Sequence, residues 1–387
     1  MLDKRYRIII LGAGFSRPAG LPLGNEIFLE ASNNILKEFG PDNPFHQELE
    51  NFIDYKKLCD NTELTPETID FEEYLSFLDI EFALGLKGSD TWSSEGNQAQ
   101  ILAKRAICKL IHSKTPHQDE IPDMYLRFAE QLKPDDYVIT FNYDILLERS
   151  LEAIGKPYRL FPNRYEEVWE SSGTLESDSG EVVILKMHGS VDWFSRESYA
   201  YLEEIRKNQG FDIRTRDPIF GEHNFYQCEP LVDGPRPEND SLTHIYRIKK
   251  VDKFYKKMPS SLAIPWILSP SHSKILYSKT LKDYWWGLGQ AGGRNLGLGI
   301  IGFSMPEHDE YLRQVMYRIV KNYQESWWDE KLLDVFKSNV KVIDKRTSEE
   351  SKQDLYNRFS FIDIEKATFH FDGLNLDTIE SFFRDDR

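Results

Sequence analysis

The chain has 387 residues, of which 40% are hydrophobic, and a formal net charge of -16. This length allows a large core and two domains, and the hydrophobic content excludes disorder over the whole chain. So acidic a surface repels a phosphate backbone, which disfavours sequence-independent binding to nucleic acid.

The three cysteines, Cys59, Cys108 and Cys228, are isolated in the sequence. Because no Cys-x-x-Cys pair occurs, a four-cysteine zinc module is excluded, and we expect no metal. This usage is typical of a reducing cytoplasm. The first apolar run is too short for a signal peptide, and no run approaches the roughly 20 residues that span a bilayer. We therefore expect a cytoplasmic protein without a membrane contact.

The first predicted element is a buried strand, Arg7–Leu11, because a short β-branched run that ends at glycine is typical of a parallel strand. Gly12–Gly24 follows as a loop that is too rich in Gly and Pro to be helical throughout. Asn25–Phe39 then has the pattern of a helix. Apolar residues recur at helical spacing over much of the next stretch, about 41–132, so we expect a helical insert there rather than sheet.

Four more strands are predicted along the chain: Tyr137–Phe141, Val182–Met187, Leu296–Ile301 and Val340–Ile343, the last of which we expect to be the final strand. Ile145–Ile154 and Tyr311–Asn322 have helical patterns. The stretch of about 195–265 has no strong period and is expected to form a second insertion or lid. The fold class is therefore α/β, with a parallel sheet, a helical insert and a second insertion. Residues 345–387 are expected to form a C-terminal extension that packs against the domain or supports oligomerisation.

Small or polar residues follow every predicted strand. They are Gly12 and Gly14, Asn142 and Asp144, His188 and Gly189, Gly302 and Ser304, and Asp344. In an open α/β sheet, ligands bind in the crevice beyond the carboxyl ends of the strands. Any one of these residues alone is best explained as an ordinary turn residue, but the repeated pattern favours a ligand site.

The residue types suggest what such a site could do. Gly12 and Gly14 allow close approach to a pyrophosphate, but Arg17 stands where the dinucleotide fingerprint has its third glycine, so the loop is not the usual dehydrogenase one. Asn142 could orient a ribose hydroxyl or a water, or form an Asx turn before the next helix. Asp144 is best explained as a helix cap. His188, with an ordinary pKa of ~6.5, is a candidate general base.

Four motifs occur in the order GAGFSRPAGLP, TFNYD, KMHGSVDW and IGFSMPEHD. Together they resemble the sirtuin superfamily, and within it the bacterial sirtuin-like effectors of anti-phage defence that cleave NAD. The motifs extend from Gly12 to Asp309, so the resemblance covers most of the chain. It implies a Rossmann-like, NAD-binding catalytic domain over residues 1–344.

The resemblance also implies a role for each motif residue. The phosphate-side loop would consist of Gly12, Ala13, Gly14 and Ser16. Gly302 and Ser304 would contact the adenosine half of NAD, and Asp344 would approach the adenine ribose. Asn142 would lie beside the nicotinamide ribose and Asp144 beside the carboxamide pocket, while His188 would be the catalytic base.

Departures from deacylating sirtuins matter as well. Those enzymes continue the first motif with Asp-Phe-Arg, where this chain has Leu23-Gly24-Asn25, and they have Gln where it has Phe141. The resemblance therefore implies an NAD glycohydrolase that cuts the nicotinamide–ribose bond and depletes NAD in abortive infection. A protein deacylase or ADP-ribosyltransferase is one alternative. A non-catalytic sensor that binds NAD or ADP-ribose is another, and a conventional dehydrogenase fits least.

An enzyme that destroys NAD must be restrained in its own cell, so we expect gating by homo-oligomerisation or by a partner. A HerA-type ATPase or an Argonaute-like protein is the partner that the resemblance implies. The strongly basic run Arg247–Lys257, RIKKVDKFYKK, is most simply a solvated face. A contact for an acidic partner or a nucleic acid is the alternative for this run.

Overall fold

The structure is a computed structural model of the whole chain. It describes residues 6–384 apart from 66–67, 88–95, 135, 161–164, 170–171, 177–179, 211–216, 233–240, 260–262, 277–280, 286–287, 289–293, 307–308 and 327–336.

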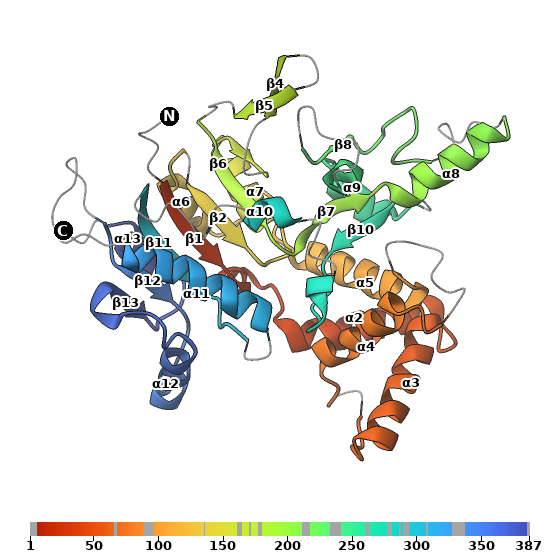
Figure 1. Cartoon of the computed structure of the whole chain (residues 1–387), viewed down its shortest axis with the longest axis horizontal. Coiled ribbons are helices and arrows are strands. Elements are labelled where there is room, and N and C mark those ends of the chain that lie inside the picture. The colour runs from red at the N-terminus through yellow and green to blue at the C-terminus, as the bar shows by residue number, and fades with distance from the viewer. Residues whose placement is uncertain are drawn as a thin grey trace.

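A seven-stranded sheet forms the centre of the fold (Figure 1). Its strands, all parallel to their neighbours, lie in the order β13-β12-β11-β1-β2-β6-β3. Their bounds are β1 Tyr6–Leu11, β2 Tyr137–Thr140, β3 Tyr158–Arg159, β6 Val182–Lys186, β11 Asn295–Ile301, β12 Val340–Ile343 and β13 Ala367–His370. The α/β class with a parallel sheet, predicted from the sequence, is confirmed.

Strand β1 lies in the middle of this sheet because its side chains can be buried on both faces. Ile10 pairs in register with Ile139 of β2 on one side and with Ile300 of β11 on the other, and all three are almost completely buried. The chain leaves β1 toward β2 and β6, and it later returns to β11 on the opposite side of β1. This reversal is a topological switch point, where an open α/β sheet places its ligand.

Helices dominate the part of the chain between β1 and β2, as predicted. They are α2 Gly24–Phe39, α3 Pro44–Cys59, α4 Phe71–Ala83, α5 Gln98–Lys114 and α6 Asp123–Gln131. Side chains of Asn43, Asp70 and Asn97 accept backbone N–H groups at the starts of α3, α4 and α5. Such N-caps replace hydrogen bonds that the first helical turn lacks. Helices α2 to α5 form a helical layer beside the sheet (Figure 1).

A second, antiparallel sheet has the strand order β10-β7-β9-β8. Its strands are β7 Gly189–Ser195, β8 Cys228–Pro230, β9 Ile245–Ile248 and β10 Ile264–Ile267. Strand β7 follows β6 after a two-residue connection that contains His188, so the two sheets meet there. Further elements in this half are α7 Leu146–Ala153, the hairpin strands β4 Tyr165–Trp169 and β5 Ser172–Glu176, α8 Glu197–Asn208, α9 Val251–Lys257 and α10 Lys282–Trp285. The predicted second insertion thus contains strands that its sequence pattern did not reveal.

The C-terminal part corrects one expectation. Val340–Ile343 is a strand, β12, but it is not the final one, since β13 pairs beside it at the edge of the sheet. The remaining helices of this part are α11 Glu310–Glu325, α12 Glu349–Arg358 and α13 Leu376–Phe383. Phe383 of α13 packs against Phe128 of α6 with a distance of 5.4 Å between ring centroids. The extension therefore completes the sheet.

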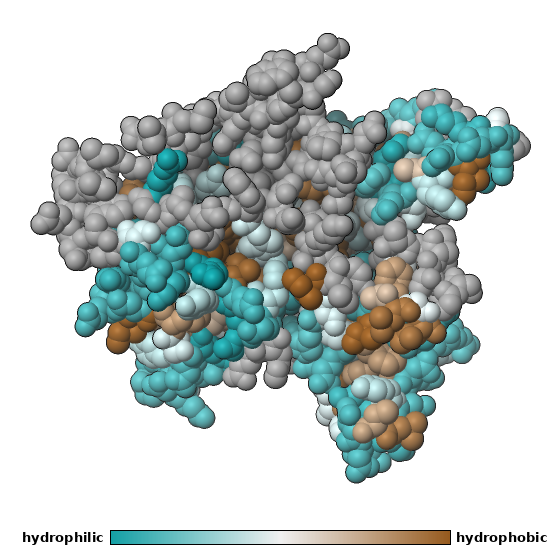
Figure 2. Space-filling view, in the orientation of Figure 1, coloured by the Kyte–Doolittle hydropathy of each residue, from teal (hydrophilic) through white to brown (hydrophobic). Residues whose placement is uncertain are grey.

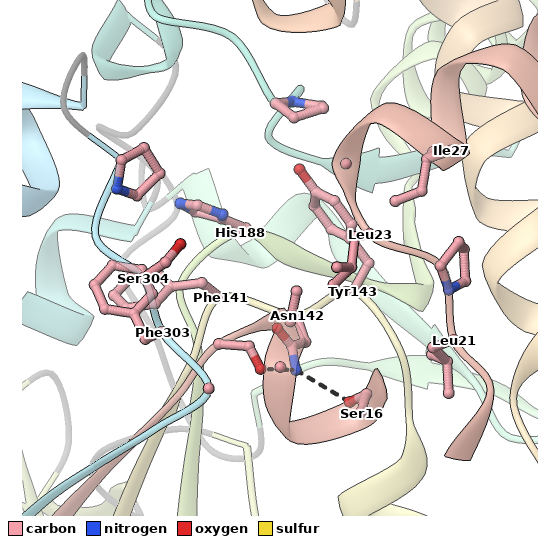
Figure 3. Close-up of a pocket in the computed structure, with 18 of the residues that line it drawn as sticks. Ser16, Leu21, Leu23, Ile27, Phe141, Asn142, Tyr143, His188, Phe303 and Ser304 are labelled. Atoms are coloured by element: carbon pink, nitrogen blue, oxygen red, sulfur yellow. Dashed lines mark hydrogen bonds between the residues drawn. The ribbon is translucent and has the colours of Figure 1, made fainter. Parts of the chain in front are cut away.

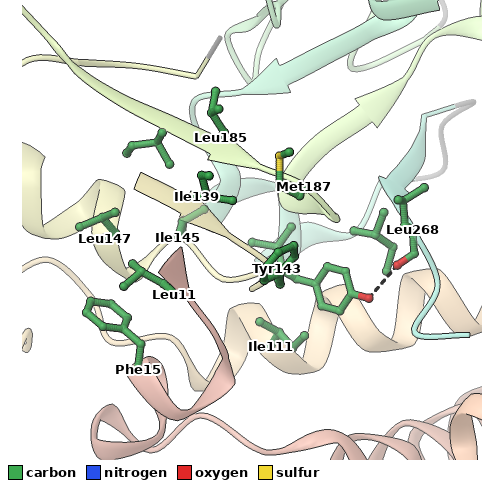
Figure 4. Close-up of a cluster of buried hydrophobic side chains, with 14 of the residues drawn as sticks. Leu11, Phe15, Ile111, Ile139, Tyr143, Ile145, Leu147, Leu185, Met187 and Leu268 are labelled. Carbon is green, nitrogen blue, oxygen red and sulfur yellow. Dashed lines mark hydrogen bonds between the residues drawn. The ribbon is translucent and has the colours of Figure 1, made fainter. Parts of the chain in front are cut away.

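The predicted loop after β1 also needs a correction, because it contains one helical turn, α1 Ala13–Ser16, and a 3-10 turn, Arg17–Ala19. Phe15 of this turn is buried in the hydrophobic core that continues under β2 and β6 (Figure 4). In the same core the Tyr143 hydroxyl donates a hydrogen bond to the Leu268 carbonyl at 2.6 Å. This hydrogen bond joins the segments that follow β2 and β10.

Hydrophobic surface gathers over α3 and α4 (Figure 2). The large exposed hydrophobic residues of these helices and of the turn after α4 are Tyr55, Leu58, Ile80, Leu84 and Leu86. Leu58 is 83% exposed and Leu84 is 69% exposed, so these side chains contribute little to the core.

Candidate active site

A cavity of about 440 Å³ opens at the carboxyl ends of the parallel strands, at the switch point beside β1. The residues predicted as site residues all line it: Gly12, Ala13, Gly14, Ser16, Asn142, Asp144, His188, Gly302, Ser304 and Asp344. The fold therefore brings together residues that lie more than 300 positions apart in the sequence. The role of each residue in binding or catalysis stays a prediction.

The glycines after β1 and β11 hold two loops in direct backbone contact. The Gly14 N–H donates to the Gly302 carbonyl at 2.8 Å, and the Gly12 N–H donates to Ile301 at 3.0 Å. A Cβ atom on Gly12 would lie 2.5 Å from the Gly302 oxygen, and Gly302 itself has φ of +60°. Only glycine suits these positions, because backbone fills the space where a Cβ would lie and Gly302 also has a left-handed conformation. The glycines thus serve first to bring the β1 and β11 loops together at the cavity floor.

Asn142 connects β2 to the loop after β1. Its side-chain amide donates to the Gly12 carbonyl at 2.9 Å and to the Ser16 hydroxyl at 3.1 Å (Figure 3). Since the Gly12 carbonyl can only accept, the NH2 group must point to it, and the side-chain oxygen accepts no hydrogen bond from the part of the chain that the structure describes. Asn142 is therefore not the cap of α7. It offers a fixed acceptor to a ligand.

Asp144 comes one residue before Ile145, the N-cap of α7, and its side chain contacts the first turn of that helix. One carboxylate oxygen accepts from the Leu146 N–H at 3.0 Å and the other accepts from the Ser16 hydroxyl at 2.8 Å. Its backbone carbonyl accepts from the Lys186 ammonium, which also pairs with Glu148 at 2.7 Å. Lys186 is completely buried, and sequence analysis missed it although a lysine at the end of an apolar strand is unusual. Asp144 thus has both oxygens engaged before any ligand arrives.

His188 lies in the connection between the two sheets and is 7% exposed. Its ring lies beside Phe141, with 5.1 Å between the ring centroids (Figure 3). Burial, with a smaller effect of the Lys274 charge, lowers the pKa of His188 well below its ordinary value. The imidazole is therefore neutral near pH 7. Its Nε2 atom is buried and has no hydrogen-bond partner among the described residues, while the ring makes a hydrogen bond to the Phe141 backbone. With the ring proton in that bond, on Nδ1, Nε2 is an acceptor at the cavity.

Charged side chains that sequence analysis did not assign to the site also line the cavity. Glu72 comes from α4, Lys274 from a 3-10 turn at Lys274–Leu276, and Asp309 from the N-cap of α11. The Lys274 ammonium lies 2.5 Å from an Asp309 carboxylate oxygen, and both side chains are about 5% exposed. These residues come from three distant segments, and nothing in their local sequence patterns predicts that they meet.

Asp344 follows β12 and contacts a cation that the sequence analysis did not consider. The Arg346 guanidinium donates to its carboxylate at 2.9 Å, and Arg346 also lines the cavity. Burial raises the pKa of Asp344, and the Arg346 charge opposes that effect. This side of the cavity therefore carries a guanidinium as well as an acid.

Within the described residues, no group of three or more His, Cys, Asp or Glu side chains is arranged to hold a metal ion. Among the same residues, no helix is both long and apolar enough to cross a membrane.

An open parallel sheet with a cavity at its switch point defines a Rossmann-like α/β protein. A family model described as "SIR2-like domain" matches residues 136–213, which include β2, the Asn142–Asp144 turn and His188. This segment is therefore similar to the sirtuin superfamily. No curated protein sequence matches the chain.

Solved structures of sirtuins are also similar at low identity. Sir2 in complex with the inhibitor EX-527, 2′-O-acetyl-ADP-ribose and deacetylated p53 peptide is 11% identical, covers 97% of this chain and 92% of its own, and has a TM-score of 0.34. Sir2Tm bound to a propionylated peptide is 12% identical, covers 98% and 92%, and has a TM-score of 0.31. Because these scores are low, the fold assignment depends on the strand order and not on these superpositions.

Proposed function

We propose that the protein is an NAD+ glycohydrolase that cleaves the bond between nicotinamide and ribose. The observation that carries the proposal is the pairing of two free acceptors on one cavity wall: the Nε2 atom of the neutral His188 and the side-chain oxygen of Asn142. The match of residues 136–213 to a SIR2-like domain supports NAD as the ligand.

The reaction follows from these two groups. The C1′–N bond breaks with its electron pair on nicotinamide, which leaves as a neutral molecule, and positive charge develops on the ribose. The oxygen of Asn142 accepts a hydrogen bond from the ribose hydroxyl or the attacking water and orients it. Water then forms the new C1′–O bond while Nε2 of His188 takes its proton and later returns it to solvent. The products are nicotinamide and ADP-ribose; a cyclised form results if a nitrogen of the adenine, and not water, forms the new bond to C1′.

The departures of this chain from deacylating sirtuins support hydrolysis over deacylation. Leu23-Gly24-Asn25 stands where those enzymes have Asp-Phe-Arg, and Leu23 and Gly24 line the cavity. The sensor hypothesis remains the second candidate, since binding alone would use the same cavity.

Depletion of NAD in anti-phage defence is the biological role that we propose for this activity. Its control by homo-oligomerisation, a HerA-type ATPase or an Argonaute-like protein belongs to the same proposal. Equal high activity of the protein alone and with the products of its neighbouring genes would contradict control by a partner.

The test is nicotinamide release from NAD by the purified protein, alone and with its genomic neighbours. Asn142→Ala and His188→Ala are expected to lower the rate at least ~100-fold each. Asn51→Ala and His117→Ala, which change exposed side chains of the same types, are the matched controls and should match the wild type. Binding of NAD without release in either setting would favour the sensor. Release that neither site substitution changes would show that the site is wrong.

A further inference from the structure

Four carboxylates line the cavity, and three of them are engaged by other groups of the protein. Asp144 accepts from the Ser16 hydroxyl and the Leu146 N–H. Asp309 pairs with Lys274 and accepts from the Leu312 N–H at the start of α11. Asp344 accepts from Arg346. The fourth is Glu72, and its situation is different.

The Glu72 carboxylate makes no hydrogen bond to any other described residue. The imidazole of His272 lies beside it, with 3.6 Å between Nδ1 and Oε2, and the Glu72 side chain is 35% exposed. The backbone of Glu72 is nevertheless firmly placed, because its N–H donates to the Asp70 cap at 2.8 Å and its carbonyl accepts from the Ser76 hydroxyl. The start of α4 thus holds at the cavity a carboxylate that contacts His272 but makes no hydrogen bond to another described residue.

The charges around Glu72 come from three elements. Burial raises the pKa of Glu72, the cations Lys274 and His272 oppose this effect, and the acids Asp309 and Asp70 add to it. The Lys274 charge also acts on His188. Glu72, Lys274 and His188 line the same cavity. Lys274 pairs with Asp309 at 2.5 Å, whereas the Glu72 carboxylate has the imidazole of His272 beside it at 3.6 Å. This part of the cavity is suited to a cation.

We propose that Glu72 is a catalytic residue whose carboxylate stabilises the positive charge that develops on the ribose of NAD. This inference rests on the proposed function. Glu72 forms no covalent bond: nicotinamide leaves with the electron pair of the broken C1′–N bond, the carboxylate faces the resulting cation, and water completes the new C1′–O bond. A carboxylate opposite a developing cation strengthens its interaction as charge forms, so it acts on the transition state more than on bound NAD.

The experiment compares Glu72→Gln with Glu73→Gln, its neighbour on α4, whose carboxylate is exposed and pairs with Lys56 at 3.2 Å. Nicotinamide release gives kcat, and calorimetric titration with NAD gives Kd. We expect Glu72→Gln to lower kcat by about 100-fold or more with Kd changed less than about threefold, and Glu73→Gln to leave both unchanged. Glu72→Asp should recover part of the rate.

The pH profile is the second readout. Wild-type kcat should fall as pH decreases through the raised pKa of Glu72, because the protonated acid carries no charge, and this decline should be absent from the residual activity of Glu72→Gln. If wild type releases nicotinamide and Glu72→Gln equals it, or changes only Kd, the role of Glu72 is overturned while the proposed function stands. If wild type binds NAD but releases nothing, alone or with its genomic neighbours, the proposed function fails and the role of Glu72 fails with it.

Discussion

His188 and Asp192 belong to one short segment where the two sheets meet, and both side chains are buried. Asp192 accepts hydrogen bonds from the Ser190 hydroxyl and from the Arg247 guanidinium at 2.7 Å, and Arg247 also donates to the Tyr158 hydroxyl at 2.8 Å. His188, four residues earlier, leaves its Nε2 atom without a partner in the described structure.

The difference separates polar groups that hold the fold from polar groups that await a ligand. Removing one partner of a hydrogen-bonded buried ion pair destabilises the fold, because the other charge stays buried without a partner. A buried nitrogen that lacks a hydrogen bond lowers the stability of the fold. Arg247 offsets the effect of burial and holds the pKa of Asp192 below its ordinary value, whereas burial alone dominates at His188. In the antiparallel sheet, Asp192 and Arg247 thus have each other as partners, whereas His188 at the cavity has an Nε2 atom without a partner among the described residues.

The largest effect is expected for the buried pair of Asp192 and Arg247. Asp192→Ala leaves the Arg247 guanidinium buried without its main partner, which should lower the free energy of unfolding by about 3–5 kcal/mol. Urea denaturation followed by circular dichroism measures this loss. Asp192→Asn, which keeps the shape and one acceptor, should lose less. A loss below ~1 kcal/mol for Asp192→Ala would mean that Asp192 and Arg247 do not form this buried ion pair in solution.

A smaller effect is expected from the loop contact on the cavity floor. In Gly302→Ala, the new Cβ would overlap the Gly14 and Phe15 backbone, and alanine is disfavoured at φ of +60°. The left-handed conformation alone costs about 1–2 kcal/mol, and the overlap must move the loop after β1. We expect a lower melting temperature and loss of NAD binding in calorimetry. Gly155→Ala, also at positive φ but with open space around its Cβ, is the control and should keep NAD binding.

The same contrast explains how far the sequence could be interpreted. Short apolar runs predicted β1, β2, β6, β11 and β12, and the residues after them line one cavity, because the carboxyl ends of parallel strands meet at one edge. The edge strand β13 was missed because its side chains are only half buried, so Ala367–His370 lacks a run of buried apolar residues. Glu72 and Lys274 were missed because only tertiary packing brings α4 and the turn after β10 to the cavity.

The pH dependence of stability tests the burial of His188 at the cavity. Because the pKa of folded His188 lies below its unfolded value, the unfolded chain binds a proton that the folded chain does not. Stability is therefore lost as pH falls below ~6.5, by at most about 1.4 kcal/mol per pH unit for this residue. His188→Gln should have a shallower decline between pH 7 and pH 5.5 in urea titrations. Part of the decline should remain, since burial also lowers the pKa of His46 and His112. An unchanged slope would contradict a buried, neutral His188.

The smallest effect is expected for Lys249, which belongs to the basic run Arg247–Lys257. Lys249 and Arg247 are both cations of this run, but they differ in burial. Lys249 pairs with Glu229 at 2.8 Å, but the two side chains are 43% and 48% exposed, so water screens the pair. Lys249→Met should therefore change the free energy of unfolding by less than about 1 kcal/mol. Arg247→Met, two residues earlier, should cost about 3–5 kcal/mol because it leaves Asp192 buried and unpaired. Equal losses in the two variants would contradict this prediction. They would show that the exposed fraction of a charged pair does not decide its contribution to the free energy of unfolding in this run.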